Sequence, residues 1–300
     1  MSTPIAYATV IVIWSTTPLA IIWSSETVTP VMAAMLRMML AAVVGLGLLR
    51  WLRIPLPWHG PALKSYLYAT LGVYGAMFTT YMAASQLSSG LISLIFGMSP
   101  IVSGLLAQFW LGEKAFSPLR WLALLLALSG LGWVLSDGLV IETSALAAVG
   151  LMLLAVLLFS ISGVLVKGVS VQIHPLAQTV GALCCSIPFY ALSWLLMDGQ
   201  LPELNGGGRS LAAIIYLGLF GSLVGFVAYY YILQQLAAST VALITLITPV
   251  LAISLGSLLN QEPLTLRLIQ GSGLICLGLA LYQWSGRRLG REVSQPQAAD

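Results

Sequence analysis

Charged side chains are scarce in this 300-residue sequence: twelve Lys and Arg and nine Asp and Glu make up 7% of the chain, whereas 59% is hydrophobic. Soluble globular domains carry roughly 25% charged residues, so these few charges cannot cover a folded chain of this size in water. The net charge of +3 is small and its basic residues are scattered, which excludes a nucleic-acid-binding surface. The composition therefore predicts a protein embedded in lipid.

Cysteine and histidine are also rare. The three cysteines, Cys184, Cys185 and Cys276, lie in apolar stretches, and none has the spacing of a metal site or a redox pair. The two histidines, His59 and His174, lie in predicted loops at the membrane surface. We therefore expect neither a metal ion nor a cofactor.

Charges, prolines and glycine clusters divide the chain into apolar runs of the length that a transmembrane helix needs. The runs show no alternation of period two, which excludes a membrane barrel and leaves helices. The first run lacks a basic leader and is longer than the apolar part of a signal peptide, so we expect it to remain as a span. The predicted fold is all-α and polytopic, with ten transmembrane helices at 5–24, 31–50, 64–86, 90–111, 119–136, 145–167, 175–197, 211–236, 240–259 and 266–285.

Lys and Arg residues are distributed unevenly between alternate loops. Positive residues accumulate on the cytoplasmic side of membrane proteins, and with a cytoplasmic N-terminus nine of them lie inside and two, Arg209 and Arg267, outside. We therefore expect both termini in the cytoplasm, with residues 287–300 forming a disordered tail. The nine inner residues are Arg50, Arg53, Lys64, Lys114, Arg120, Lys167, Arg287, Arg288 and Arg291.

The two halves of the chain resemble each other. Each half holds five predicted spans, an odd number, so the second copy must enter the membrane from the opposite side. We therefore predict two inverted repeats, residues 1–140 and 141–286, an architecture that recurs in secondary transporters. The matched positions are Trp14-Ser15 with Phe159-Ser160, Pro30 with Pro175, Gly72 with Gly221, Tyr81 with Tyr230, Ser99-Pro100 with Thr248-Pro249, and Glu113 with Glu262.

These motifs resemble those of the EamA branch of the drug/metabolite transporter superfamily, over nearly the whole chain. One departure is Gln261, where the family often has Gly. The resemblance implies export or exchange of small metabolites, such as amino acids and related compounds, across the bacterial inner membrane, without fixing the substrate. The residues that carry it are Trp14-Ser15, Arg37 after Pro30, Ser89-Gly90-Leu91 through Ser99-Pro100 to Leu111-Gly112-Glu113, and the second copy from Ser239-Thr240-Val241 through Thr248-Pro249 to Gln261-Glu262.

Arg37 is the one charge placed well inside a predicted span. An arginine near the middle of a bilayer costs about 2.5–3.5 kcal/mol on insertion scales, so it should face protein or water and is a functional candidate by default. Its planar guanidinium suits a substrate carboxylate. The alternative is a structural role, in which Arg37 bonds backbone carbonyls of a neighbouring helix or extends toward Glu26.

Acidic residues are confined to the ends of the spans and to loops. The spans therefore lack the buried carboxylate relay that usually couples transport to protons, and we expect facilitated flux or exchange. Glu113 and Glu262 end the fourth and ninth spans on opposite faces and are candidates for a pair of gates. The alternative is that they are solvated helix ends or pair with Lys114 and Arg267.

Aromatic, amide and hydroxyl side chains supply most of the remaining polar specificity inside the spans. They are candidates for a mostly apolar cavity with a few polar contacts, which suits flat or amphipathic solutes. The alternative for each is a place in the interfacial aromatic belt or in a helix–helix hydrogen bond. The candidates are Trp14, Tyr74, Phe78, Tyr81, Phe96, Phe159, Ser160, Gln178, Tyr229, Tyr230, Gln234, Thr245 and Thr248.

Pro100 and Pro249 interrupt the fourth and ninth spans near their middles. A proline frees a carbonyl and allows a helix to bend. Because alternating access needs bends at matching positions of the two halves, these prolines are the predicted hinges. Proline is also frequent in membrane helices without a special role.

The leading interpretation is a carrier whose two halves rock around a pocket near the membrane midplane and move small organic metabolites outward. A channel or a non-transporting scaffold is the alternative. An enzyme is not expected, because the spans offer no catalytic constellation. The expected partners are a small-molecule substrate and the lipid bilayer, and a monomer is the working assumption.

Overall fold

The computed structural model describes residues 2–112, 117–136, 143–197, 199, 208–235 and 244–293. Within these ranges every regular element is a helix. The helices are α1 (Thr3–Ser24), α2 (Pro30–Trp51), α3 (Gly60–Thr70), η1 (Leu71–Ala76), α4 (Met77–Ala84), α5 (Ser89–Phe96), α6 (Ser99–Trp110), α7 (Pro118–Leu135), α8 (Thr143–Lys167), α9 (Pro175–Met197), α10 (Gly208–Tyr216), η2 (Leu217–Val224), α11 (Gly225–Gln235), α13 (Ile244–Asn260) and α14 (Leu266–Val293).

Each of the ten predicted segments overlaps a helix or a run of consecutive helices. Seven runs in the described part of the chain are long and apolar enough to cross a bilayer, and α13 is a shorter apolar helix. The prediction of a multi-pass helical membrane protein is therefore confirmed, whereas the count of ten spans stays a prediction. The seven runs are Thr3–Ser24, Pro30–Trp51, Ser89–Trp110, Pro118–Leu135, Leu146–Lys167, Pro175–Met197 and Gly208–Gln235.

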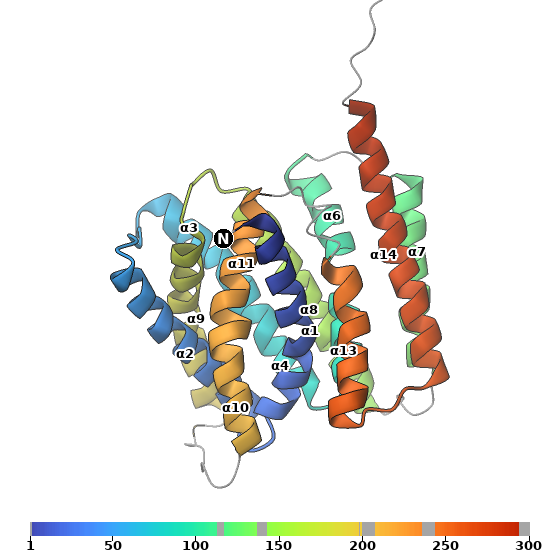
Figure 1. The fold of residues 1–300 in the computed structure, drawn as a ribbon, viewed down its shortest axis with the longest axis horizontal. Helices are drawn as coiled ribbons and strands as arrows, with labels where there is room; N and C mark the ends of the chain where they lie inside the picture. Colours follow the sequence, from blue (N-terminus) through green and yellow to red (C-terminus); the bar gives the residue numbers. More distant parts are fainter. Residues whose placement is uncertain are drawn as a thin grey trace, which may run out of the picture.

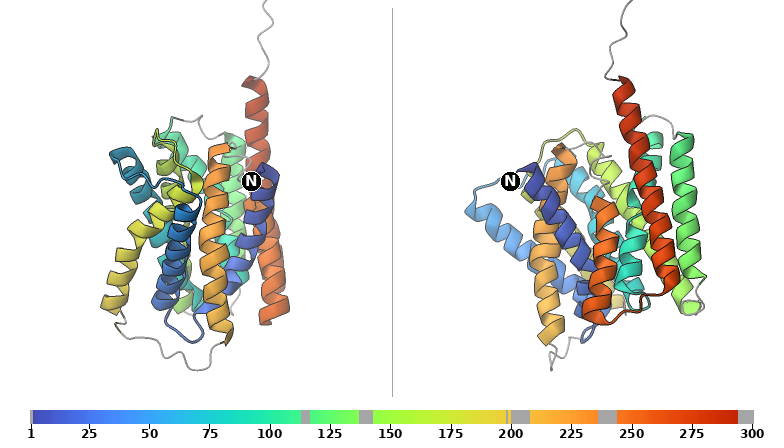
Figure 2. Two further views of the ribbon diagram at one scale, coloured as in Figure 1. Left: turned by 60° about the vertical axis from the view of Figure 1, so that its left-hand side comes forward. Right: turned by 45° about the vertical axis from the view of Figure 1, so that its right-hand side comes forward.

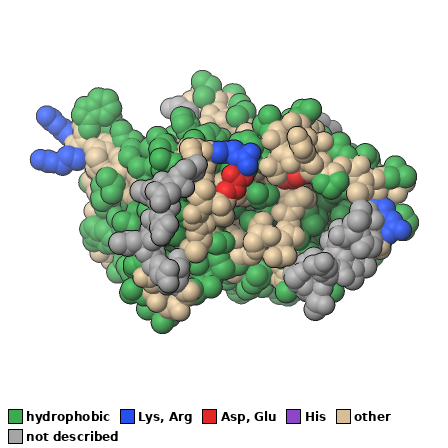
Figure 3. Space-filling model, turned by 90° about the horizontal axis from the view of Figure 1, so that it is seen from below, with side chains coloured by type: hydrophobic (Ala, Val, Ile, Leu, Met, Phe, Trp, Pro, Cys, Tyr) green, Lys and Arg blue, Asp and Glu red, His purple; other side chains and the backbone are tan. Residues whose placement is uncertain are grey.

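The outer surface of the bundle is apolar. Large hydrophobic side chains such as Trp51, Phe109 and Leu196 are exposed on it, and Figure 3 shows hydrophobic side chains around the molecule with few charges between them. Apolar surface of this extent marks contact with lipid or with another protein. The lipid contact predicted from composition is in keeping with this surface.

The helices form one upright bundle (Figure 1). Helix α1 begins and α14 ends at the same end of the bundle, as both views of Figure 2 also show. Helices α7 and α14 pack closely along one side, and α2 packs against α9 on the other. Helix α1 packs against α13, and α8 packs against α6. The middle of the bundle is therefore built from α1, α8 and their neighbours.

Glycines allow α7 and α14 to approach closely. A Cβ atom built on Gly130 would lie 2.7 Å from the carbonyl oxygen of Gly271, and one on Gly271 would lie 2.6 Å from that of Gly130. Small residues at such crossings let backbones pack in a membrane, where no hydrophobic force drives helices together. The sequence GSLVG at residues 221–225 spans the end of η2 and the start of α11, and η2 packs against α2.

Two segments have π-helical geometry, η1 and η2. They lie at matched places in the two halves, because Gly72 in η1 and Gly221 in η2 are a matched pair. Wide turns of this kind are rare in proteins overall, but those that occur are often found at functional sites. The sequence analysis did not predict them.

The fourth predicted span is broken rather than bent. Helix α5 ends at Phe96 and α6 begins at Ser99, so Pro100 lies in the first turn of α6. Proline is tolerated there because the backbone N–H group that it lacks would have no partner within the helix. Pro249 lies inside α13. A third proline, Pro18, lies inside α1.

The last helix is longer than expected. Helix α14 continues to Val293, whereas a disordered tail was expected from residue 287. The predicted start of the tail therefore lies inside this helix, and the disorder predicted for the tail stays a prediction.

Candidate functional site

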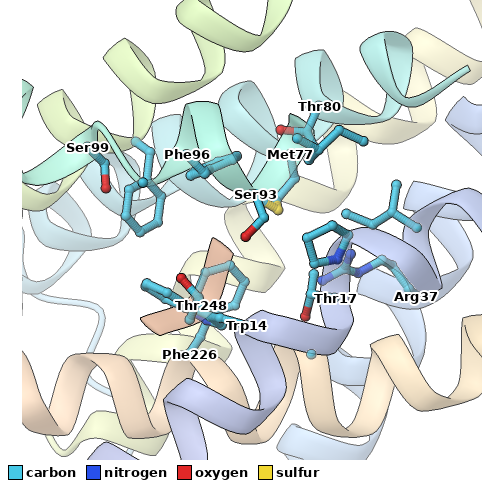
Figure 4. Close-up of a pocket in the computed structure, with 16 residues that line it drawn as sticks. Trp14, Thr17, Arg37, Met77, Thr80, Ser93, Phe96, Ser99, Phe226 and Thr248 are labelled. Atoms are coloured by element: carbon cyan, nitrogen blue, oxygen red, sulfur yellow. The ribbon is translucent and has the colours of Figure 1, made fainter. Parts of the chain in front are cut away.

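A small cavity lies in the middle of the bundle and is lined by residues of both halves of the chain (Figure 4). Its volume of about 80 Å³ has room for several water-sized groups, at about 10–15 Å³ each. We call it the central pocket. Its lining residues are Trp14, Thr17, Pro18, Ile21, Arg37, Met77, Thr80, Ile92, Ser93, Phe96, Gly97, Ser99, Phe159, Gly221, Phe226 and Thr248.

Arg37 is the only charged residue in this lining. Its side chain is 1% exposed. The Nε atom donates to Ser222 Oγ at 2.9 Å, and Nη1 donates to Tyr81 Oη at 3.4 Å. The guanidinium carbon lies 5.7 Å from the centre of the Tyr81 ring. Both hydrogen-bond partners are neutral, so they orient the guanidinium without neutralising its charge.

Neither structural alternative for Arg37 is observed. Glu26 pairs with Arg209, and the hydrogen bonds of Arg37 go to side-chain hydroxyls rather than to backbone carbonyls. Within the described residues, no carboxylate pairs with Arg37. Among the described residues, the buried positive charge of Arg37 therefore has no compensating carboxylate in the pocket.

Aromatic rings form the opposite part of the pocket. Trp14 and Phe96 each contact Phe159 edge to face, with ring centres 5.8 Å and 5.7 Å apart. Tyr229 packs behind Trp14 and Phe159 at 5.5 Å and 5.4 Å. This edge-to-face geometry is a favourable arrangement for aromatic pairs. It gives the pocket a firm apolar wall.

The hydroxyl groups in the lining fall into two kinds. Those of Thr17 and Thr80 donate to carbonyls four residues earlier in their own helices, both at 2.7 Å. Ser93 and Thr248 are 4% and 5% exposed and have no hydrogen-bond partner among the described residues. In Figure 4 the Ser93 hydroxyl lies between Phe96 and Arg37, and the Thr248 hydroxyl lies beside Trp14 and Phe226. These two hydroxyls are available to a bound molecule.

The structure brings five of the predicted residues into the lining, namely Trp14, Arg37, Phe96, Phe159 and Thr248. Three more lie directly behind it. Tyr81 contacts Arg37, Tyr229 supports the aromatic wall, and Ser160 Oγ donates to the Ser99 carbonyl at 3.2 Å.

Tyr74 and Phe78 lie elsewhere, against α9. Tyr74 Oη shares a hydrogen bond of 2.6 Å with Ser193 Oγ, and its ring stacks on Phe78 at 5.5 Å and lies 5.4 Å from Phe189. Met77 and Thr80 of the same region face the central pocket instead. Tyr74 lies in η1, and the wide π turn rotates the following residues away from the faces expected of an α-helix.

A second cavity, of about 700 Å³, contains three further predicted residues, Gln178, Tyr230 and Gln234. It lies at the end of the bundle where α1 begins, between the ends of α8 and α11 and the starts of α3 and α9. Gln178 Oε1 accepts from Ser65 Oγ at 2.9 Å, and Gln234 Nε2 donates to the Ile173 carbonyl at 3.0 Å. These residues line this polar cavity rather than the central pocket.

Glu262 binds across the bundle to the start of another helix. Its carboxylate accepts from the backbone N–H groups of Ser89 and Gly90, at 3.1 Å and 3.4 Å, and from Ser89 Oγ at 2.9 Å. Asn260 Nδ2 also donates to it at 3.1 Å. A carboxylate at a helix N-terminus satisfies free N–H groups and complements the dipole. Glu262, which follows the neighbouring helix α13, thus caps α5.

The expected alternative partner of Glu262, Arg267, lies elsewhere. Arg267 donates to the Ser136 carbonyl and lies 5.8 Å from the ring of Trp133. Glu113, and the Lys114 expected as its alternative partner, lie outside the described residues, as does the side chain of Thr245. The structure therefore describes one of the two predicted gate residues.

Further polar contacts close the same end of the bundle as Glu262. Arg209 pairs with Glu26, Ser210 Oγ donates to the Ser24 carbonyl at 2.8 Å, and Trp23 Nε1 donates to Asn260 Oδ1 at 3.0 Å. We call this group of contacts, with those of Glu262, the outer clasp. It joins α1, α5, α10 and α13.

Sequence reasoning missed the pocket residues Thr17, Ile21, Met77, Thr80 and Ser93. A signal for the first two was present: Trp14, Thr17, Pro18 and Ile21 follow the spacing of one helical face. Extending that face from Trp14 would have found them. The others follow the π segment or lie beside the break between α5 and α6, where regular spacing does not help.

The fold and the site define a polytopic helical membrane protein with a small internal pocket. The profile of the EamA-like transporter family matches residues 2–136 and 146–283. The chain belongs to this family, whose members are membrane transporters of small molecules rather than enzymes.

Curated relatives are similar along most of their length. An uncharacterized transporter of Archaeoglobus fulgidus is 26% identical over 92% of this chain and 96% of its own. An uncharacterized protein of Pseudomonas aeruginosa is 34% identical over 76% of this chain and 75% of its own. Protein PagO of Salmonella typhimurium is 27% identical over 85% of this chain and 84% of its own.

A crystal structure of another protein has a similar fold. It superimposes with a TM-score of 0.67 and covers 96% of this chain and 98% of its own, at 17% sequence identity. This likeness bears on the fold alone.

Proposed function

We propose that the protein is a carrier that moves small organic metabolites through the central pocket by alternating access. The two halves, residues 1–140 and 141–286, act as inverted five-helix repeats, with ten spans in all. By the class expected from sequence, the solutes are amino acids or related amphipathic compounds. The observation that carries the proposal is that matched residues of the two halves line one pocket: Trp14 with Phe159, and Ser99 with Thr248.

The packing of the last helix of each half supports the inversion. Ser117 at the start of α7 shares a hydrogen bond of 2.8 Å with Ser285 near the end of the apolar part of α14. At the other end, Arg267 of α14 donates to the Ser136 carbonyl that follows α7. Helices α7 and α14 therefore run antiparallel, as matched helices of inverted repeats must. The matched π segments η1 and η2 agree with the same duplication.

The two ends of the bundle differ in a way that suits a carrier facing one side. The outer clasp closes the end at which Glu26, Arg209 and Glu262 lie. The second cavity opens the end where α1 begins. Phe226 lines the central pocket and Tyr230 lines the second cavity, and the two rings stack 6.3 Å apart on α11. Their rings form part of the wall between the cavities.

In this proposal Glu262 and its matched residue Glu113 act as gates, and Pro100 and Pro249 lie at the hinges. On the basis of the distribution of Lys and Arg, we propose that the second cavity and both termini face the cytoplasm and that the outer clasp faces outside. The relatives support a multi-pass membrane protein, and we propose the bacterial inner membrane as its location.

Cysteine labelling in oriented vesicles tests this arrangement, starting from a variant with Cys184, Cys185 and Cys276 replaced by serine. We expect Lys114→Cys to react with an impermeant thiol reagent from the cytoplasmic side only, and Leu264→Cys from the outside only. A cysteine at Ser93, in the central pocket, should react from both sides, because the pocket opens to each in turn.

Two outcomes would contradict the proposal. Labelling of Lys114→Cys and Leu264→Cys from the same side would exclude inverted repeats. Labelling of Ser93→Cys from one side only would exclude alternating access. The exposed Leu63→Cys, at the start of α3, is the control that reports vesicle orientation.

A further inference from the structure

We propose that the central pocket selects small organic monoanions, specifically monocarboxylates with a flat apolar body, over zwitterions and cations of the same shape. This inference rests on the proposed function, because it names the substrate class of that pocket. It narrows the expected group of amino acids and related compounds to its anionic members.

The charge of the pocket carries the argument. Arg37 is buried, and its described hydrogen-bond partners are two neutral hydroxyls. None of the sixteen lining residues is an Asp or Glu. Burial of an uncompensated charge is unfavourable, and a buried charge is normally paired. A bound monoanion brings the pocket to neutrality, whereas a zwitterion leaves it at one positive charge and a cation raises it to two.

The geometry of Arg37 favours a carboxylate as that anion. The guanidinium presents its donors in one plane, which matches the two oxygens of a carboxylate. Nε is held by Ser222 and Nη1 by Tyr81, and these contacts fix the orientation of the plane at one end of the pocket. In Figure 4 the guanidinium nitrogens lie beside Thr17, and Ser93 lies between them and Phe96.

The helix ends at the pocket do not supply an opposing preference. The C-terminus of α5 at Phe96 and the N-terminus of α6 at Ser99 both lie in the lining. Their dipoles have opposite signs at this point and largely offset each other. The preference for charge therefore rests on Arg37.

The rest of the pocket fits the body of such a solute. Trp14, Phe96 and Phe159 form an apolar wall suited to a ring or a planar chain. The hydroxyls of Ser93 and Thr248 have no partner among the described residues. Ser93 lies between that wall and Arg37, and Thr248 lies beside Trp14 in the wall. They offer hydrogen bonds to a carboxylate oxygen or a neighbouring polar substituent. No acidic residue in the lining offers a partner for an ammonium group.

Three probes with one carbon skeleton test the inference: phenylpropionate, phenylalanine and 3-phenylpropylamine, which are an anion, a zwitterion and a cation. Binding to the purified protein in nanodiscs is measured by calorimetry. We expect phenylpropionate to bind at least about tenfold more tightly than either of the others. In Arg37→Gln its affinity should fall by about 10- to 100-fold, the range for losing a hydrogen bond to a charged group. Equal or tighter binding of phenylalanine by the wild type would overturn the inference.

Control variants separate the role of Arg37 from general effects. Lys64→Gln removes a positive charge at an exposed position outside both cavities and should leave the affinity unchanged. Arg37→Lys keeps the charge without the fork, and we expect an intermediate affinity. If Arg37→Gln does not fold, two other measurements test the inference: the affinities of the three probes for the wild type, and the affinity of phenylpropionate for Ser93→Ala. We expect Ser93→Ala to bind phenylpropionate a few-fold more weakly. An unchanged affinity in Ser93→Ala together with no preference for the anion overturns it.

Transport distinguishes this inference from the proposed function. In proteoliposomes, labelled phenylpropionate should show saturable counterflow. Selective binding without counterflow would contradict the carrier and leave the anion pocket in place. Counterflow of phenylalanine in preference to phenylpropionate would contradict the anion pocket and leave the carrier in place.

Discussion

Replacing Gly271 with leucine should lower the melting temperature of the protein by about 5 °C or more. A Cβ atom at Gly271 would lie 2.6 Å from the Gly130 carbonyl oxygen and against the Val134 side chain. Backbone atoms cannot move aside singly, so the larger side chain must push α7 and α14 apart. Overpacking of this kind costs about 3 kcal/mol at the upper end of its usual range, and each kcal/mol shifts the melting temperature of a large domain by about 2 °C or more.

Gly273→Leu is the matched control for this prediction. Gly273 lies two residues further along the same helix, and nothing lies within 4 Å of a Cβ built there. Both variants gain the same helix propensity, so the difference between them measures the helix contact. Thermal unfolding followed by size-exclusion fluorescence in one detergent gives both values. Equal melting temperatures for the two variants would show that α7 and α14 are not held by this close approach.

Replacing Glu262 with alanine should open the outer end of the bundle. The carboxylate caps the first turn of α5 through Ser89 and Gly90, and hydrogen bonds to charged groups contribute about 1.5–3 kcal/mol. Under alternating access, losing this cap should raise the population of the outward-open form by about tenfold or more. The measurement is the rate at which an impermeant reagent added outside labels Ser93→Cys.

Glu26→Ala provides the comparison. It removes another contact of the outer clasp, the pair with Arg209, whose arginine side chain is largely exposed. Surface ion pairs contribute about 0–1 kcal/mol, so labelling should rise by a factor of about five at most. If Glu262→Ala leaves the labelling rate at its original value, Glu262 is a fixed cap of α5 and not a gate.

The helices and the apolar outer surface could be predicted from sequence because lipid imposes strong rules on composition and length. The starts of α2 and α9 coincide with Pro30 and Pro175, and a proline at the first helical position is a local signal. Trp14 and Phe159 could be found because they occupy matched positions in the two halves. In each case the information lies in a short stretch of sequence or in the comparison of two stretches.

The positions and contacts that could not be predicted depend on geometry that sequence does not carry. Tyr74 and Phe78 lie in and just after η1, and one wide turn changes which side of a helix later residues face. Glu262 contacts Ser89, which is 173 positions away, and that partner follows from the packing of α13 against α5. The partners of Arg37, Ser222 and Tyr81, likewise belong to other helices.

The outer clasp consists of polar groups at the rim of the bundle, and this has an energetic consequence. When such contacts separate, their donors and acceptors meet water at once. Each exchanged hydrogen bond therefore changes the free energy by about 0.5–1.5 kcal/mol between neutral groups and about 1.5–3 kcal/mol at a charged group such as Glu262. A seal made of buried aliphatic side chains would instead expose apolar area, at roughly 25 cal/mol per Å². Under the proposed alternating access, the forms open to either side therefore lie close enough in energy for thermal fluctuation to interconvert them.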